Sequence, residues 1–340
     1  MTTSIVVLGL NFGRHIVEDL MRGQAGMRLV GVCDLDQGKA EAVAAMHAVR
    51  VYPSLDAIHA DPGVAAVGLF TGPNGRGGLI ERCVAAGKHV MTTKPFELDA
   101  AAAERALATA RRLGRVVHLN SPAPVPSPDL AIIEGWRAES DLGRLVAAQA
   151  EVWASYREQA DGSWYDDPVR CPVAPLYRLG IYLLNDLLRL GGPVERVHVE
   201  ATRLFTGRPT PDQAQVSLRF ASGALGQVFA SFCIEDGDHY RNAMTLRFER
   251  GTIYRNVGPQ RGSAVAELAL IRGNGSGTRT MRSANCGQIS GGYAWEAFAR
   301  AVADGTPLSE EAADIAVEGI RVMAAIAAAE RCGQPQLVRS

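Results

Sequence analysis

The fold of the first half of the chain is decided by the segment TSIVVLGLNFGRH, residues 3–15. A β-branched run ends at Gly9, and a helical pattern follows Gly13. A glycine turn between a strand and a helix brings backbone N–H groups and the helix N-terminus onto a pyrophosphate. The segment therefore predicts a dinucleotide site contacted by Gly9, Asn11, Phe12 and Gly13. Asn11 stands where a second glycine is usual and adds bulk there.

Asp34 follows the second predicted strand, about twenty residues past the turn. A carboxylate at this position can accept hydrogen bonds from both hydroxyls of the adenosine ribose, and it repels a 2′-phosphate. We therefore expect NAD as the cofactor in preference to NADP, and Lys39 is the residue most able to reverse that preference. The alternative is a glycine turn and an exposed acid in an α/β protein without a cofactor.

The first 120 residues alternate short β-branched runs with Ala-rich helical segments. This alternation predicts a doubly wound parallel sheet with helices on both faces, as in a Rossmann domain. The predicted strands are Ile5–Leu8, Arg28–Cys33, Ala65–Phe70, His89–Met91 and Val116–Leu119. Four prolines between Asn120 and Pro128 exclude a continuing strand or helix. Residues 1–121 are therefore predicted to form the NAD(P)-binding domain.

Residues 122–340 are predicted to form an α+β domain for substrate binding and oligomerisation. Its expected elements are helices near 129–139 and 174–190, alternating strands between 194 and 281, and closing helices at 294–304 and 309–331. The alternating segments indicate a large, mostly antiparallel open sheet. Too few helices follow to cover both of its faces, so one face is expected to pack on a second subunit.

The composition excludes several kinds of partner. Lys plus Arg (35) nearly balance Asp plus Glu (36), without charge runs, so we expect no nucleic acid or anionic lipid partner. No apolar stretch of about eighteen residues and no charged leader occurs, which predicts a cytoplasmic protein without a membrane span. The six cysteines lack metal or redox spacing, and Glu235–His239 is interpreted as a solvated loop. No metal site is predicted.

Two further segments lie at C-terminal strand ends, where open α/β sheets bind ligands. They are Thr71-Gly-Pro73-Asn74 and Thr93-Lys94-Pro95. We interpret Thr71, Pro73, Asn74, Lys94 and Pro95 as cofactor contacts. Lys94 precedes a proline, which biases it away from helix, and no neighbour in sequence explains a cation there. The alternative for Lys94 is an ordinary surface lysine.

In order and spacing, these residues resemble the Gfo/Idh/MocA oxidoreductases, relatives of glucose-fructose oxidoreductase and inositol dehydrogenase. The resemblance covers nearly the whole chain and continues through Gly87-Lys-His-Val, Gly180-Ile-Tyr182-Leu-Leu-Asn185, Ser222-Gly223, Gly251-Thr252 and Phe298–Pro307. It implies a dehydrogenase that transfers hydride between a nicotinamide cofactor and a secondary alcohol or ketone. The implied substrate is a sugar, polyol or related cyclic compound, and a homodimer or homotetramer is implied through the C-terminal sheet.

The resemblance also implies two catalytic residues. Lys94 contacts the nicotinamide end and the substrate oxygen, and Tyr182 transfers the proton. Tyr182 replaces the histidine that is common in the family, so the chain is similar to the tyrosine branch. A phenol with a pKa of about 10 needs a nearby cation to act as a base at neutral pH, and Lys94 and Arg178 are candidates. The alternative for Tyr182 is a half-buried aromatic in an apolar helix stripe.

Substrate contacts are expected from Arg178, Trp164, Tyr165 and Asn185. Arg178 stands where the family has a sugar-binding aspartate, which indicates an anionic group on the substrate. The alternative for Arg178 is a structural ion pair with one of three nearby acids, which are Asp166, Asp167 and Asp186. Trp164 and Tyr165 either line the substrate cleft or anchor their loop. Asn185 replaces a further family aspartate.

Two other functions stay open. One is a non-catalytic sensor or regulator that keeps the dinucleotide pocket. It is supported by departures from the family pattern at Asn11, at Arg178, at Thr93 in place of a glutamate, and at Gly77 in place of a histidine. The other is an NAD-dependent glycosidase-like enzyme in which the hydride returns within one catalytic cycle.

Overall fold

The computed structural model describes residues 2–237, 240–258, 265–273, 279–287 and 291–338. The chain divides into two compact units. The first comprises Met1–Val125 and Tyr293–Val317, and the second comprises Pro126–Gly292 and Glu318–Ser340. The first unit thus differs from the predicted range 1–121 mainly by a segment that returns to it late in the chain.

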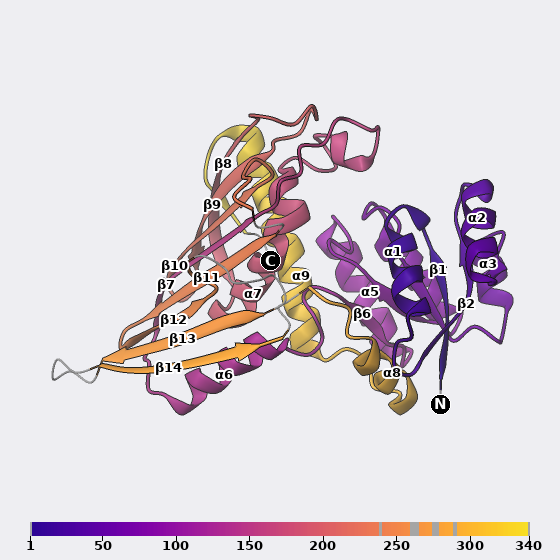
Figure 1. The fold of residues 1–340 in the computed structure, drawn as a ribbon, viewed down its shortest axis with the longest axis horizontal. Coiled ribbons are helices and arrows are strands. Elements are labelled where there is room, and N and C mark those ends of the chain that lie inside the picture. Colours follow the sequence, from indigo (N-terminus) through magenta and orange to yellow (C-terminus); the bar gives the residue numbers. More distant parts are fainter. Residues whose placement is uncertain (1, 238–239, 259–264, 274–278, 288–290, 339–340) are drawn as a thin grey trace. The chain divides into compact units, whose positions relative to one another are not determined.

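The first unit, whose strands β1, β2 and β6 are labelled in Figure 1, contains a six-stranded parallel sheet. Its strand order, β3-β2-β1-β4-β5-β6, confirms the predicted doubly wound sheet. Its strands are β1 (Thr3–Leu8), β2 (Met27–Cys33), β3 (Arg50–Val51), β4 (Ala66–Leu69), β5 (His89–Thr92) and β6 (Val117–Leu119). The chain runs outward from β1 to β3 and then returns to β4 on the other side of β1. Open sheets bind dinucleotides at this reversal of strand order.

Several helices lie wholly within the first unit. They are α1 (Leu10–Met21), α2 (Gln37–His47), α3 (Leu55–Ala60), α4 (Arg76–Ala85), α5 (Ala100–Arg112) and α8 (Trp295–Asp304). Trp295 and Phe298 of the returning α8 are buried in one apolar cluster with Ile5 and Phe70. The Trp295 indole also donates a hydrogen bond of 2.8 Å to Asp19. The core of the first unit is therefore completed by residues from near the end of the chain.

The second unit contains a nine-stranded sheet in the order β14-β13-β12-β11-β7-β10-β9-β8-β15. Its strands are β7 (Leu145–Trp153), β8 (Val194–Thr202), β9 (Gln213–Phe220), β10 (Leu225–Ser231), β11 (Arg241–Phe248), β12 (Gly251–Arg255), β13 (Ala266–Gly273), β14 (Arg279–Cys286) and β15 (Gln336–Leu337). Neighbouring strands are antiparallel except β7 and β10, which are parallel. The predicted mostly antiparallel sheet is confirmed.

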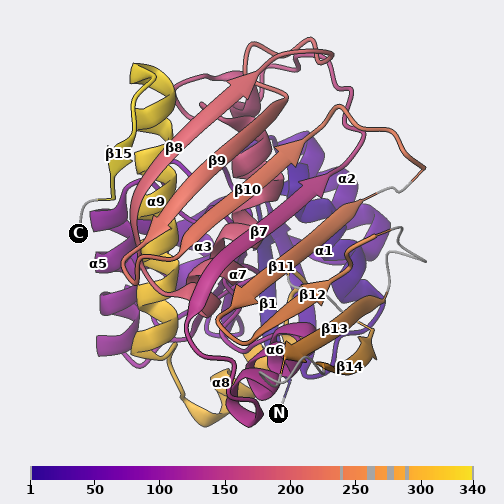
Figure 2. The same ribbon diagram turned by 90° about the vertical axis from the view of Figure 1, so that its left-hand side faces the viewer.

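The helices of the second unit are α6 (Pro128–Glu139), α7 (Ile181–Gly191) and most of α9 (Glu310–Cys332). The residues of α9 before Glu318 belong to the first unit. A π-helical turn, Leu176–Gly180, leads into α7, and a 3₁₀ turn spans Trp164–Asp166. Figure 2 shows the sheet from the face that α7 and α9 do not cover. Along β9, buried apolar residues alternate with more exposed polar ones, as a sheet with one covered face requires.

A buried ion cluster fixes α7 to its neighbours. Arg255, which is fully buried, contacts Asp129 of α6 at 2.8 Å and Asp186 of α7 at 2.9 Å. It also donates to Asn242 of β11 at 2.6 Å. Breaking a buried pair of this kind costs about 3–5 kcal/mol, because one charge is left uncompensated. The helix that carries Tyr182 is therefore linked to α6, β11 and β12 through buried polar contacts.

In the part of the chain that the structure describes, no helix combines the length and the apolarity needed to cross a membrane.

Candidate functional site

Gly9 forms the turn between β1 and α1 with a positive φ of 91°. A Cβ atom there would lie 2.9 Å from the main chain of Phe70 and Thr71, so only glycine fits. Gly13 is also closely packed, because its Cβ would lie 3.0 Å from Val7. Gly9 has no side chain to cap α1, so the amides of the first turn beyond Leu10, whose own N–H is bonded to Asp34, are placed to bind an anionic ligand.

Asp34 lies beside this turn, as the sequence predicted. Its Oδ2 atom accepts a hydrogen bond of 2.6 Å from the Leu10 amide, and its Oδ1 atom accepts one of 2.9 Å from the Asp36 amide. The end of β2 and the start of α1 are thereby joined through one carboxylate. A ribose bound against this edge would meet Asp34 directly.

Lys39 also reaches the turn. It comes from the first turn of α2, and its ammonium donates a hydrogen bond of 2.6 Å to Asn11 Oδ1. The side chain that favours a free ribose and the cation able to bind a 2′-phosphate therefore lie at the same edge. Phe12 is 47% exposed, with its ring centroid 6.1 Å from that of Phe70.

Lys94 follows β5, and its side chain is partly exposed. Its main-chain N–H donates a hydrogen bond of 3.0 Å to Asn120 Oδ1, at the end of β6. Pro95, like Pro73 in the loop after β4, is buried, whereas Asn74 is exposed and Thr71 partly so. The predicted cofactor contacts after β4 and β5 thus occupy two neighbouring strand ends.

Arg76, the first residue of α4, joins these two strand ends, and the sequence reasoning missed it. Its side chain is buried and donates to the carbonyl of Thr93 at 2.6 Å and to that of Pro95 at 2.8 Å. It also donates to the carbonyl of Thr71. An arginine in the first turn of a helix is usually expected to be exposed. The one sequence feature that could have pointed to Arg76 is its position soon after the end of a strand, where ligands bind.

Gly77, next to Arg76, is tightly packed. Its N–H donates 2.7 Å to Glu97 Oε2. A Cβ atom would lie 3.0 Å from the Ala102 carbonyl and 3.1 Å from the same Glu97 oxygen. This close packing accounts for the glycine at a position where the family has a histidine.

In the second unit, Tyr182 occupies the second position of α7 and is partly exposed. Its ring lies against Gly291, where a Cβ atom would be 2.8 Å from Tyr182 Cε1. Asn185, one turn later, is 3% exposed and faces α9, because a Cβ atom on Gly319 would lie 2.5 Å from its Oδ1. Asn185 is thus placed among helices of the second unit.

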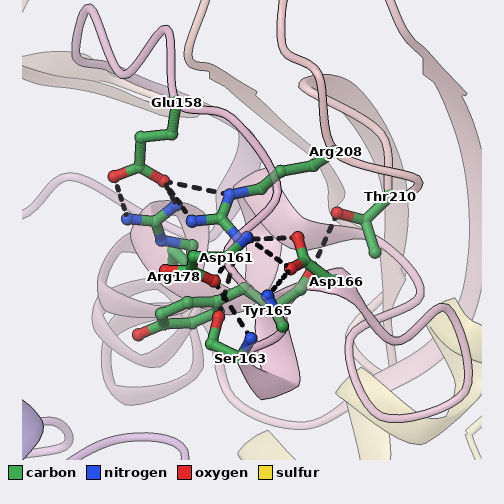
Figure 3. Close-up of polar contacts among 9 residues, drawn as sticks. Glu158, Asp161, Ser163, Tyr165, Asp166, Arg178, Arg208 and Thr210 are labelled. Atoms are coloured by element: carbon green, nitrogen blue, oxygen red, sulfur yellow. Dashed lines mark hydrogen bonds and ion pairs between the residues drawn. The ribbon is translucent and has the colours of Figure 1, made fainter.

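Arg178, one turn before Tyr182, forms an ion pair with Glu158, a partner that the sequence reasoning did not consider. Two of its nitrogens contact the carboxylate at 2.5 and 3.0 Å (Figure 3). The guanidinium carbon lies 4.3 Å from the ring centroid of Tyr165, which itself lies 4.3 Å from that of Trp164. Tyr156 and Phe232 flank the same guanidinium.

The three aspartates considered for Arg178 each contact another arginine. The pairs are Asp166 with Arg208 at 2.6 Å, Asp167 with Arg170 at 3.2 Å and Asp186 with Arg255 at 2.9 Å. The ion pair considered as the alternative for Arg178 therefore exists, but with a different acid.

Arg208, from the loop between β8 and β9, extends this cluster. Its side chain is 6% exposed and contacts Glu158 at 3.2 Å, Asp161 at 3.0 Å and Asp166 at 2.6 Å (Figure 3). We call Glu158, Asp161, Asp166, Arg178 and Arg208 the Arg178–Arg208 network. It joins the loop after β7, the loop before β9 and the turn that begins α7.

The charges of this network are mutually compensated. Hydrogen bonding to Arg178 holds the pKa of Glu158 below its usual range, despite partial burial, and Arg208 acts in the same direction. Hydrogen bonds from Arg208 likewise lower the pKa of Asp161. Burial alone would lower the pKa of Arg178, but the bond to Glu158 raises it. All five groups are therefore charged at neutral pH, and three carboxylates face two guanidinium groups.

Within the described residues there is no group of three or more histidine, cysteine or acidic side chains arranged to hold a metal ion. His239 lies outside the described residues.

Two family models match the chain. Residues 3–121 match "Oxidoreductase family, NAD-binding Rossmann fold", and residues 130–254 match "GFO/IDH/MocA C-terminal domain". Inositol 2-dehydrogenase 1 of Saccharopolyspora erythraea is 36% identical over 118 residues, 34% of this chain and 35% of that protein. Inositol 2-dehydrogenase of Rhizobium meliloti is 35% identical over 100 residues, 29% of this chain and 30% of that protein. These matches span roughly a third of each curated relative.

Solved structures share the whole fold. A putative NADPH-dependent oxidoreductase from Desulfitobacterium hafniense superposes with a TM-score of 0.80 at 16% identity, covering 99% of this chain and 98% of the other. Levoglucosan dehydrogenase in complex with NADH gives 0.79 at 16% identity over the full length of both chains. With the two family models, these observations lead to one conclusion. The chain belongs to the Gfo/Idh/MocA family of oxidoreductases.

Proposed function

We propose that this protein is an NAD-dependent oxidoreductase that transfers hydride between nicotinamide and a secondary alcohol or ketone of a sugar, polyol or related cyclic compound. The observation that carries the proposal is the joining of Asp34 to the N-terminus of α1 beside Gly9. This edge suits a dinucleotide, because it offers helix N–H groups for phosphates and a carboxylate for ribose hydroxyls. The names of the curated relatives point to cyclic polyols as substrates.

NAD would supply the acceptor or donor of the hydride. Gly9, Asn11, Phe12 and Gly13 would hold its pyrophosphate, and Asp34 its adenosine ribose. Thr71, Pro73, Asn74, Lys94 and Pro95 would form the nicotinamide side. The preference for NAD rests on Asp34. Lys39, which contacts Asn11, is the cation that could bind the 2′-phosphate of NADP at this edge.

We assign proton transfer to Tyr182 and orientation of the substrate oxygen to Lys94. The phenol would take the hydroxyl proton as hydride leaves the same carbon, or return it when a ketone is reduced. We further propose Trp164 and Tyr165 as apolar walls for the substrate ring, because sugar rings pack on aromatic side chains through their C–H faces.

The substrate is proposed to be neutral rather than acidic. From the sequence, Arg178 indicated an anionic substrate group, but its guanidinium is paired with Glu158 through two contacts. The Arg178–Arg208 network carries one carboxylate more than it has guanidinium groups. An added carboxylate would meet net negative charge there, whereas hydroxyl groups could donate to the network oxygens.

The test begins with calorimetric titration of NAD and NADP separately. Reduced nicotinamide is then followed by its absorbance while myo-inositol, levoglucosan and galacturonate are offered. We expect NAD binding and turnover of a neutral compound in preference to the acid. Failure to bind either dinucleotide would refute the proposal. Binding without turnover across a broad polyol panel would favour the sensor, and glycoside cleavage without net reduction of NAD would favour the glycosidase-like enzyme.

We also propose a homodimer or homotetramer formed through the sheet face that α7 and α9 leave uncovered (Figure 2). Sedimentation equilibrium tests this assembly. A charge introduced at Phe229, which is partly exposed on β10, should dissociate it. A monomeric wild-type protein at micromolar concentration would contradict the proposal.

A further inference from the structure

The side chain of Arg76 turns back from α4 into the protein, where it is 2% exposed. Arginine is almost never fully buried unless its donors are matched, because removing a guanidinium from water is costly. Here the two terminal nitrogens donate to main-chain carbonyls of two separate segments, the loop after β4 at Thr71 and the loop after β5 at Thr93 and Pro95. The planar group with five N–H donors suits such fixed acceptors, and a lysine ammonium does not.

The carbonyls that Arg76 binds lie on both sides of one residue. Thr93 and Pro95 are the two chain neighbours of Lys94, and the N–H of Lys94 itself donates to Asn120. The main chain is therefore fixed by hydrogen bonds at the residue before Lys94, at the residue after it and at the amide of Lys94 itself. Its side chain stays partly exposed. Holding the main chain in this way fixes the point and the direction from which the Lys94 side chain extends.

These two loops belong to one half of the dinucleotide site. A doubly wound sheet has two mononucleotide-binding halves, and a dinucleotide lies across the reversal of strand order between them. Gly9 and Asp34 lie at the ends of β1 and β2 and would hold the adenosine half. The ends of β4 and β5, which Arg76 joins, belong to the half that would take nicotinamide.

We propose that Arg76 is a positioning residue that locks the nicotinamide half of the site and thereby places Lys94. This inference rests on the proposed function, since it takes Lys94 as the residue that orients the reacting groups. Misplacement of a reacting group by about 1 Å can cost roughly 100-fold in rate, so a lock of this kind matters to turnover. A merely structural arginine would weaken the whole first unit and both halves of the site alike.

The test compares two ligands that differ only in the nicotinamide. Dissociation constants for NADH and for ADP-ribose are measured for the wild type, Arg76→Met and Arg76→Lys. Arg82→Met is the matched control, because Arg82 lies on the same helix, is 53% exposed and pairs with Asp56. We expect Arg76→Met to weaken NADH binding roughly tenfold, the worth of about one hydrogen bond, and ADP-ribose binding by less than about twofold. Arg76→Lys should fall between wild type and Arg76→Met.

Amide hydrogen exchange gives a second readout that needs no ligand. In Arg76→Met, or in Arg76→Lys if the methionine variant does not fold, exchange should accelerate in peptides covering 71–77 and 93–97 but not in those covering β1 and α1. Equal loss of NADH and ADP-ribose affinity, or exchange that rises evenly through the first unit, would overturn the inference. If the wild type binds neither ligand, the proposed function fails, and the exchange pattern still decides whether Arg76 holds the two loops.

Discussion

Replacing Glu158 by glutamine should destabilise the second unit by removing the charge that two arginines share. The carboxylate accepts two bonds from Arg178 and one from Arg208. Arg208 keeps Asp161 and Asp166, so the loss falls mainly on Arg178, whose side chain is 13% exposed. A glutamine in place of Glu158 would offer Arg178 only one acceptor oxygen and no negative charge.

The expected cost follows from the bonds that are lost. A hydrogen bond to a charged group contributes about 1.5–3 kcal/mol. The side chain of Glu158 is 35% exposed, so solvent screening places the expected loss near the lower end, about 2 kcal/mol. Because Arg178 lowers the pKa of Glu158, the stabilisation is complete above the ordinary pKa of a glutamate and is lost as the pH falls through the folded value.

Urea denaturation followed by tryptophan fluorescence measures this difference, since three of the four tryptophans lie in the second unit. The control is Glu195→Gln, which removes a more exposed pair with Arg219 and should cost less than about 1 kcal/mol. The difference between wild type and Glu158→Gln should be full at neutral pH and shrink below about pH 4. A Glu158→Gln variant as stable as the control at neutral pH, or a difference that does not change with pH, would refute the reasoning.

Three further predictions concern catalysis, the cofactor and pH. Tyr182→Phe should lower kcat by roughly 100-fold or more without changing the Kd for NADH, because only the proton-transfer group is lost; a variant that retains most of its turnover contradicts the assignment. Asp34→Ser should shift the ratio of Kd values toward NADP by roughly tenfold, and adding Lys39→Met should reverse the shift, both measured by calorimetry; an unchanged ratio counts against the role of this edge. Burial lowers the pKa of His89 to about 4, and its Nδ1 accepts from the Val116 amide at 3.0 Å, so the unfolded chain binds the extra proton between about pH 6.5 and pH 4. Stability should therefore fall by up to about 3 kcal/mol as the pH drops through this window, and His89→Gln should reduce that dependence in denaturation curves; an equally steep dependence in the variant would exclude His89 as its source.

Most of the first sheet was predictable because its strands are short β-branched runs between turn residues. β7 was missed, although it lies centrally between β10 and β11. Its sequence LVAAQAEVW contains three alanines, a residue type with low β propensity. Apolar and polar residues do not alternate clearly along it. The position of β7 is set by its neighbours in the sheet, and the local pattern does not show it.

The candidate site divides in the same way. The meeting of Gly9 and Asp34 was predictable, because a glycine turn and a strand end impose their geometry locally. An ion pair was the alternative considered for Arg178, whose first interpretation was a substrate contact. Its partner, Glu158, lies in an irregular loop twenty positions earlier and was not among the acids considered. Arg76 was missed because its role depends on a side chain that points inward, and a single sequence does not give that direction.

The return of Tyr293–Val317 to the first unit has a consequence for synthesis on the ribosome. Trp295 and Phe298 are buried in the core around β1, so the cofactor-binding unit cannot close its apolar core when its first 125 residues emerge. Until residues 293–317 have been translated, the nascent unit carries an uncovered apolar surface, which is a natural binding site for a chaperone.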